Sequence, residues 1–203
     1  MNDRDDIFSR IRSALEPLPE RTPLPDYDNT LMICEPLREG LTTRALFAER
    51  LKSVNGIFLD SPEALADLLR HESALVGYCD PGLVELFRME AFAGVEFRST
   101  FDVAHYEDFT FGITRAVGIA ESGTVMLTDT TVGSRLAALS PWLHVAVVRE
   151  SDLLPHLPAA IERFGNDPNI VWATGPSKTA DVEGILIEGV HGPGVQAALI
   201  VAD

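Results

Sequence analysis

The sequence predicts an α/β fold in which helices pack on the faces of a mainly parallel sheet. From residue 40 onward, segments with apolar residues at helical spacing alternate with short apolar runs that are typical of buried strands. Apolar residues make up 46% of the 203 residues and charged residues 23%, as in ordinary folded proteins. A chain of this length can bury roughly 70% of its unfolded surface. These observations predict a substantial folded core.

The first element is a short amphipathic helix between Asp3 and Glu16, ended by Pro17. Its apolar residues recur at helical spacing: Ile7, Phe8, Ile11 and Leu15. Residues 17–28 are rich in proline and predict either an extended arm or an N-terminal segment without fixed order. We therefore expect a helix and proline-rich arm over residues 1–30, followed by a single α/β domain over residues 31–203.

Helices and strands alternate in the first half of this domain. Ser61 and Pro62 are start signals for a helix, as the N-cap and the first-turn residue. Because helices join the successive strands, the strands are expected to run parallel. The predicted helices cover residues 41–54, 61–71 and 81–91, and the predicted strands cover residues 56–60, 73–79 and 94–100.

An antiparallel hairpin interrupts this alternation in the second half. Apolar runs at residues 115–120 and 124–129 are separated by Glu121, Ser122 and Gly123, which is the spacing of a hairpin with a bulged turn. The result is a mixed sheet with a hairpin set into an α/β frame. The other predicted elements are a short helix over 134–139, a strand over 142–149, a helix bent by its prolines over 152–164, and strands over 169–174, 184–189 and 195–202.

Composition excludes several classes of function. The formal charge of −15 would repel the phosphate backbone of nucleic acid over most of the surface. Cys34 and Cys79 form no C-x-x-C pair, so cysteines of this chain cannot build an iron–sulfur cluster or a structural zinc site. The acidic start is unlike a signal peptide, and no apolar run approaches the ~18 residues of a membrane span. We expect a soluble, cytoplasmic protein with no metal or cofactor of its own.

The glycine-rich stretch GPSKTADVEGILIEGVHGPG, residues 175–194, follows the predicted strand 169–174. Ligands of open α/β sheets usually bind where strands end. A helix beginning near Ser177 or Thr179 would offer free N–H groups beside the Lys178 ammonium, which together form an anion cradle. In the alternative, acidic residues merely cap that helix. The candidate ligand-binding residues of this stretch are Gly175, Ser177, Lys178, Thr179, Asp181 and Gly192.

His191 is a candidate catalytic residue of the same stretch, because its imidazole can titrate near neutral pH. It lies three residues after Glu188, but the surrounding glycines and Pro193 make a zinc-binding helix improbable. The alternative is a histidine that only bonds to loop backbone. No Walker loop and no Gly-x-Gly-x-x-Gly fingerprint occurs in the chain, so nucleotide hydrolysis is not indicated.

Glu121 is the second candidate catalytic residue, placed at the hairpin turn after an apolar strand. Its carboxylate is suited to act as a base or as a covalent nucleophile, with Ser122, Gly123 and Thr124 as neighbouring ligand-binding residues. The alternative is an exposed turn glutamate. No Gly-x-Ser-x-Gly elbow is present, which leaves serine-hydrolase chemistry without support. His144 lies within an apolar strand and is expected to be a core residue.

Three segments, GITRAVGIAESGTVML, RLAALSPWLHVAVV and GPSKTADVEGILIEGVHGPG, resemble the LUD-domain family in order and spacing, and within it the lactate utilization protein C group. The resemblance covers nearly the whole chain. It implies a three-layer α/β/α fold of the NagB/RpiA/CoA-transferase-like type. It also implies an accessory role in bacterial oxidation of L-lactate to pyruvate, beside partner proteins that carry the iron–sulfur and electron-transfer groups.

One departure from the family pattern concerns Gly194, where a basic residue often follows His-Gly-Pro. Lys178, with Arg115 or Arg135, would then supply the positive charge for an anion. The leading hypothesis is that residues 121–124, 175–181 and 189–194 converge on one site for a small organic anion of the lactate and pyruvate class, or for a partner subunit. The alternatives are an acyl- or CoA-transferase-like enzyme that uses Glu121, and a scaffold or regulatory subunit without catalysis.

Overall fold

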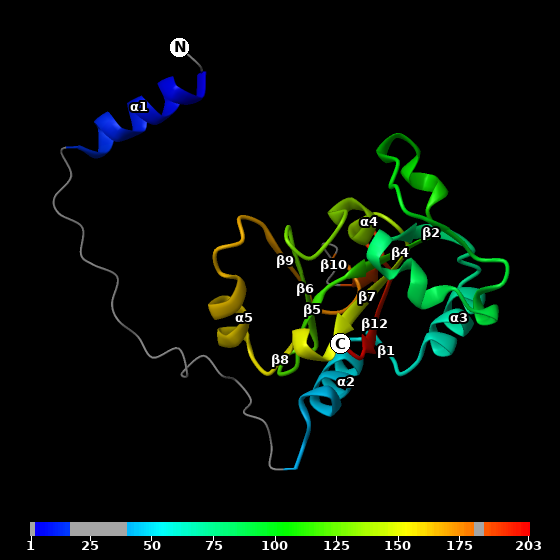
Figure 1. Ribbon diagram of the computed structural model, residues 1–203. Coiled ribbons are helices and arrows are strands. Elements are labelled where there is room, and N and C mark those ends of the chain that lie inside the picture. Colours follow the sequence, from blue (N-terminus) through cyan, green and yellow to red (C-terminus); the bar gives the residue numbers. More distant parts are fainter. Residues whose placement is uncertain (1–2, 17–39, 181–184) are drawn as a thin grey trace.

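Six parallel strands form the central sheet in a computed structural model of the chain, which describes residues 3–16, 40–180 and 185–203 (Figure 1). Every neighbouring pair of strands in this sheet runs parallel. The register aligns Phe111 with Leu143, and Leu143 with Val195. The predicted α/β class with a mainly parallel sheet is confirmed. In spatial order the strands are β1 (Ile57–Leu59), β12 (Val195–Val201), β7 (Leu143–Arg149), β4 (Phe111–Arg115), β2 (Val76–Cys79) and β3 (Glu96–Arg98).

One face of this sheet packs against α3 (Pro62–His71) and the 3-10 helices η2 (Pro81–Phe87) and η3 (Glu90–Phe92). The α3 helix starts as predicted, since the Ser61 hydroxyl accepts a hydrogen bond of 3.2 Å from the backbone N–H of Ala64. A further 3-10 helix, η4 (Val103–Asp108), precedes β4.

Residues 81–91 contain η2 and the start of η3 instead of the single predicted helix. Phe87 and Phe92 are five residues apart, so an α-helix would direct their side chains toward different sides. The break between η2 and η3 places the two rings 5.3 Å apart, centroid to centroid, and both are buried in the core. Packing of these rings therefore decides the local backbone.

The other face of the central sheet packs against α2 (Thr43–Ser53), α4 (Arg135–Leu139) and a second sheet. The predicted hairpin is the centre of this second sheet, because β5 and β6 pair antiparallel. Leu46, Phe47 and Leu51 of α2 fill the space between the two sheets. The second sheet has the order β8 (Leu153–Leu154), β5 (Val117–Ile119), β6 (Thr124–Thr128) and β9 (Ile170–Ala173).

Helix α5 (Leu157–Phe164) covers the outer face of the second sheet. Its residue Ala160 is buried with Val117 and Met126. A single bent helix was expected over residues 152–164, but η5 (Glu150–Asp152) and β8 occupy the first part of this range. In Figure 1, α3 and α5 lie on opposite sides of the central strands. The second sheet is therefore a layer between the central sheet and α5.

The chain passes without a turn from the central sheet into the second sheet. Strand β4 ends at Arg115 and β5 begins at Val117, while the backbone N–H of Ala116 still donates to the Val147 carbonyl at 3.0 Å. The apolar pattern predicted one strand over 115–120 and did not identify β4. No glycine, proline or turn motif marks the point where the strand changes sheets.

The predicted N-terminal helix is observed as α1 (Asp3–Leu15), and none of its residues is buried. A two-stranded antiparallel ribbon is formed by β10 (Lys178–Ala180) and β11 (Leu186–Glu188). The predicted proline-rich arm over 17–28 lies outside the described residues. Among the helices that the structure describes, none has the length and apolar character required to cross a bilayer.

His144 is a buried core residue, as predicted, and it forms a polar row across three neighbouring strands. Its Nε2 lies 2.9 Å from the Thr114 hydroxyl, and its Nδ1 lies 2.9 Å from Oε1 of Gln196. Because that amide oxygen only accepts, Nδ1 carries the proton and Nε2 accepts from Thr114. Burial lowers the pKa of His144 to about 4, although the hydrogen bond to Gln196 opposes part of this shift.

We predict that acidification from pH 7.5 to 4.5 lowers the free energy of unfolding through His144. The imidazole titrates near 6.5 when unfolded and near 4 when folded, so the unfolded state binds more protons between these values. The contribution is on the order of 2–3 kcal/mol. Urea unfolding of wild type and His144→Gln at both pH values measures it. Equal pH dependence in the two proteins would contradict it, and the exposed His71→Gln variant is the control.

Candidate functional site

The turn between β5 and β6 holds the first group of predicted site residues. Gly123 has a φ of +65°, and a Cβ atom there would lie 2.3 Å from the backbone nitrogen of Leu51 in α2. Both the dihedral and the close approach require glycine. The predicted bulged turn thus also packs the hairpin against the last turn of α2.

The Glu121 carboxylate is held at the N-terminus of α5. Its Oε1 accepts a hydrogen bond of 2.6 Å from the backbone N–H of Leu157, the first residue of that helix. The backbone N–H of Glu121 donates to the Pro155 carbonyl at 3.1 Å. The second oxygen, Oε2, is buried and has no hydrogen-bond partner. A buried polar atom in this state costs about 1–3 kcal/mol.

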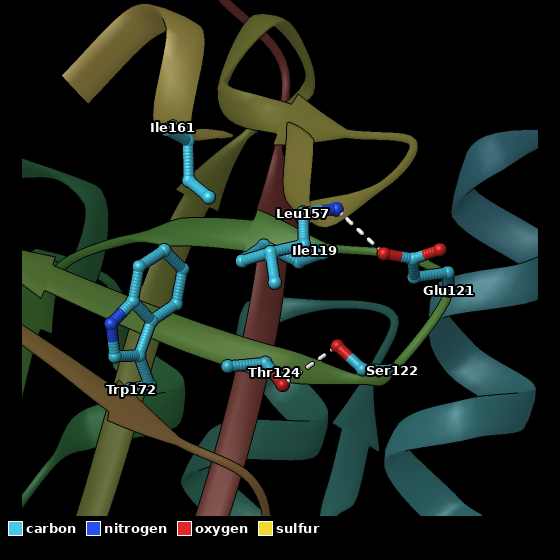
Figure 2. Close-up of a pocket in the computed structure, with 7 residues that line it drawn as sticks. All are labelled: Ile119, Glu121, Ser122, Thr124, Leu157, Ile161 and Trp172. Carbon is cyan, nitrogen blue, oxygen red and sulfur yellow. Dashed lines mark hydrogen bonds between the residues drawn. The ribbon is translucent and has the colours of Figure 1, made fainter. Parts of the chain in front are cut away.

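Glu121 borders a pocket of about 480 Å³ at the outer face of the second sheet (Figure 2). The volume is within the usual range for sites that bind organic ligands. The pocket lies between the outer face of the second sheet and the side of α5 that carries Leu157 and Ile161. Most of its wall is apolar. The lining residues are Ile119, Glu121, Ser122, Thr124, Leu157, Ile161 and Trp172.

A row of hydroxyl groups begins at the polar side of the pocket. The Ser122 and Thr124 oxygens lie 2.7 Å apart, and the Thr124 oxygen lies 2.8 Å from that of Thr174 at the end of β9. Each hydroxyl can donate or accept, so the row can reverse its direction to suit a bound group. Glu121 and this row are the polar groups of the pocket (Figure 2).

The second group of predicted residues does not form a helix or an anion cradle. Lys178 and Thr179 belong to β10, which pairs with β11. The backbone N–H of Ser177, one of the expected free donors, binds the Pro193 carbonyl at 2.8 Å. Ribbon pairing therefore uses backbone that a helix N-terminus would have left available. Asp181 lies outside the described residues.

The predicted cations do not line the pocket. Each lies in an ion pair with an acidic residue that is outside the pocket lining, so none is positioned to neutralise a ligand anion beside Glu121. The ion pairs are Lys178 with Glu188 at 3.6 Å, Arg115 with Asp152 at 3.8 Å, and Arg135 with Asp129 at 3.1 Å.

The location expected for the glycine-rich stretch was also wrong. Gly175 follows β9, which belongs to the second sheet and pairs antiparallel with β6. Residues 189–194 directly precede β12, so they lie at the amino ends of the parallel strands. The rule that ligands bind at the carboxyl ends of parallel strands therefore does not apply to either turn.

The three predicted segments are nevertheless neighbours. Ser177 binds Pro193 and Gly189 through the backbone, and Thr174 joins β9 to the hairpin turn. Gly175 has a φ of +78° and packs on Val54. Of the predicted site residues, Glu121, Ser122 and Thr124 line the pocket, whereas His191 is exposed and is absent from its wall. The described residues 174–177 and 189–193 thus lie beside the hairpin turn and are joined to one another.

The apolar wall of the pocket was not predicted as part of a site. Ile119, Leu157, Ile161 and Trp172 look like core residues in the sequence, and only the structure shows that they line a pocket between α5 and the second sheet. Trp172 is 40% exposed in the middle of a strand, which marks an unfilled position. Among the described residues, no group of three or more His, Cys, Asp or Glu side chains could hold a metal ion.

Gly194, the departure from the family pattern, has a packing cause. A Cβ atom at this position would lie 2.2 Å from the ring of Trp142, and the ring also lies over Gly189. A basic side chain at residue 194 and the indole at residue 142 cannot occupy this space together.

We predict that Gly194→Ala destabilises the protein by about 1–3 kcal/mol, as overpacking does. In a Trp142→Ala background the same substitution should cost at least ~1 kcal/mol less, because the colliding ring is gone. Thermal or urea unfolding of the four proteins in this cycle measures the coupling. Additive effects would show that the ring is not what excludes a side chain at residue 194.

Comparison with known proteins places these features in a family. A family model described as the LUD domain matches residues 80–201, a span that contains every residue lining the pocket. Lactate utilization protein C of Bacillus licheniformis is 33% identical over 128 residues, or 59% of this chain and 51% of the relative. The protein of that name from Bacillus subtilis is 34% identical over 106 residues, or 48% of this chain and 44% of the relative. The chain thus spans about half the length of these relatives.

A solved structure supports the fold. The crystal structure of a DUF162 family protein from Deinococcus radiodurans aligns with a TM-score of 0.58 at 21% identity, covering 80% of this chain and 99% of that chain. Since the family model matches more than half of the residues, the chain described here belongs to the LUD domain family.

Proposed function

We propose that this chain acts in bacterial lactate utilization and holds an organic ligand in the pocket beside Glu121. The names of its relatives support the first part, since they are called lactate utilization protein C. The observation that carries the second part is the pocket beside the hairpin turn, whose mainly apolar wall also holds the Glu121 carboxylate and the hydroxyls of Ser122 and Thr124. The redox step would then belong to iron–sulfur and electron-transfer partner proteins, as the family resemblance implies.

The lining of the pocket determines which ligand chemistry it suits. Its one ionisable lining group is the Glu121 carboxylate, which would repel the carboxylate of free lactate or pyruvate. A ligand that fits offers an N–H or O–H group to the polar side of the pocket at Glu121 and an apolar portion to Trp172 and Ile161. An uncharged molecule therefore suits this pocket better than the small anion that the sequence suggested.

We predict that lactamide, an uncharged amide, binds this protein about tenfold more tightly than lactate, which has nearly the same size. The ratio corresponds to about 1.4 kcal/mol and reflects repulsion of the anion by Glu121. Glu121→Gln should reduce the ratio to about one, while its amide oxygen keeps the bond from Leu157. Ligand-observed NMR titration gives both dissociation constants.

Glu162→Gln is the matched control, because Glu162 is an exposed carboxylate of α5 that does not line the pocket. Its variant should retain the wild-type ratio. Tighter binding of lactate than of lactamide, or no binding of either probe at millimolar concentration, would contradict a pocket at Glu121 that prefers hydrogen-bond donors to anions.

A second function is acyl transfer through Glu121. It is favoured because one carboxylate oxygen is hydrogen-bonded and the other is not. Oε1 is held by the Leu157 N–H, which leaves Oε2 as the attacking atom; because Oε2 is buried in this structure, the turn must move to expose it to a thioester. Attack of Oε2 on an acyl-CoA thioester would form an anhydride and expel the CoA thiolate. The thiolate would then attack the Glu121 carbonyl carbon, release the free acid and leave a glutamyl thioester. The Leu157 N–H would bind the carbonyl oxygen in both intermediates.

We predict for this second function that incubation with acetyl-CoA adds a hydroxylamine-sensitive group to Glu121. Intact mass spectrometry followed by peptide mapping locates it. Glu121→Gln should remain unmodified and Glu162→Gln should be modified like wild type. An unmodified wild-type protein would exclude acyl transfer with this donor and leave the binding function to be judged by the NMR ratio.

A further inference from the structure

The pocket beside Glu121 carries a negative charge that no lining residue balances. Glu121 is its one ionisable lining group, and no lysine, arginine or histidine is among the residues that line it. Within the described part of the chain, Glu121 also belongs to no ion pair. The N–H of Leu157 at the start of α5 stabilises the carboxylate, but a helix terminus supplies only about half an elementary charge. The groups that line the pocket therefore keep a net negative charge.

Trp172 supplies an aromatic ring to the same pocket. It pairs with Met126, which lies two residues from Thr124 on β6, so the side chains of Trp172 and Thr124 emerge on the same face of the second sheet. In Figure 2 the indole and the Glu121 carboxylate lie on opposite sides of Thr124. A ligand in the pocket can thus lie against the ring at one end and face the carboxylate at the other.

The indole of Trp172 is not used by the cations of the chain. Among the described residues, four arginines lie over phenylalanine rings, 4.9 to 5.7 Å from the ring centroids, and none lies over Trp172. Indole attracts cations more strongly than the other aromatic side chains do. The ring that attracts cations best is therefore left available at the pocket.

The apolar wall determines which kind of cation fits. Ile119, Leu157 and Ile161 offer no side-chain hydrogen bonds, so a small inorganic ion would lose its hydration without replacement. A cation whose charge is surrounded by carbon loses less hydration and gains apolar contact with this wall. The formal charge of −15 also raises the local concentration of cations around the whole protein.

We propose that the ligand of this pocket is a compact organic cation of the methylated-ammonium class. Its charge lies over Trp172, and a hydroxyl or N–H group of the ligand faces Glu121 and Ser122. This inference rests on the proposed function, because it names the ligand class for the same pocket. The aromatic face and the carboxylate act together, since each attracts a cation and neither attracts an anion.

Choline and 3,3-dimethylbutan-1-ol test the charge. The two molecules share one shape and one hydroxyl group, and they differ in that a cationic nitrogen replaces a carbon atom. At about 150 mM NaCl, which screens attraction to the acidic surface, we expect choline to bind about tenfold more tightly. Ligand-observed NMR titration gives both dissociation constants. The N-methyl signal of choline should also move upfield on binding, because these methyl groups lie over an aromatic ring.

Trp172→Leu keeps an apolar side chain and removes the aromatic face. It should reduce the affinity for choline to about that for the alcohol, and it should change the affinity for the alcohol less than about twofold. Trp142→Leu is the matched control, because Trp142 is also a half-exposed tryptophan, 51% accessible, but does not line the pocket. This variant should retain the wild-type ratio.

The outcomes distinguish this inference from the proposed function. Equal binding of choline and the alcohol, or an affinity for choline that Trp172→Leu leaves unchanged, would overturn the organic cation and retain the pocket as a site for uncharged ligands. No binding of choline, the alcohol or lactamide at millimolar concentration would overturn both.

Discussion

The last turn of α2 is the packing surface on which the candidate site depends. Gly123 of the hairpin and Gly175 after β9 both approach the backbone of this turn so closely that neither has room for a Cβ atom. Two segments about fifty residues apart are thereby fixed to one helix end, and the bond between Thr124 and Thr174 joins them. The positions of β5, β6 and β9 follow, and with them the floor of the pocket.

Glu121 shows how this frame can maintain an unfavourable arrangement. A glutamate at a hairpin turn ordinarily faces water, and both of its carboxylate oxygens are then hydrated. Here the backbone of Leu157 binds one oxygen and the packed turn excludes solvent from the other. Such a cost is tolerated where the surrounding structure over-determines the conformation, and it is concentrated at functional sites. The apolar wall around the carboxylate strengthens its interaction with any donor that enters.

Local signals predicted most of the fold. The Ser61 cap, the hairpin spacing at 121–123 and the buried run 142–149 each depend on neighbouring residues in sequence, and all three are present. Glu121, Ser122 and Thr124, which are close in the sequence, line one pocket for the same reason. The errors concern long-range packing. The helix expected at Ser177 was replaced by pairing with β11, and the pocket wall depends on how α5 lies across the second sheet.

The direct passage from β4 to β5 has a mechanical consequence. Ala116 is the single residue between β4 of the central sheet and β5 of the second sheet, which leads to Glu121. The two sheets therefore cannot move apart at this point. Deleting the hairpin or exchanging it as a unit would therefore disrupt β4, a strand in the middle of the central sheet.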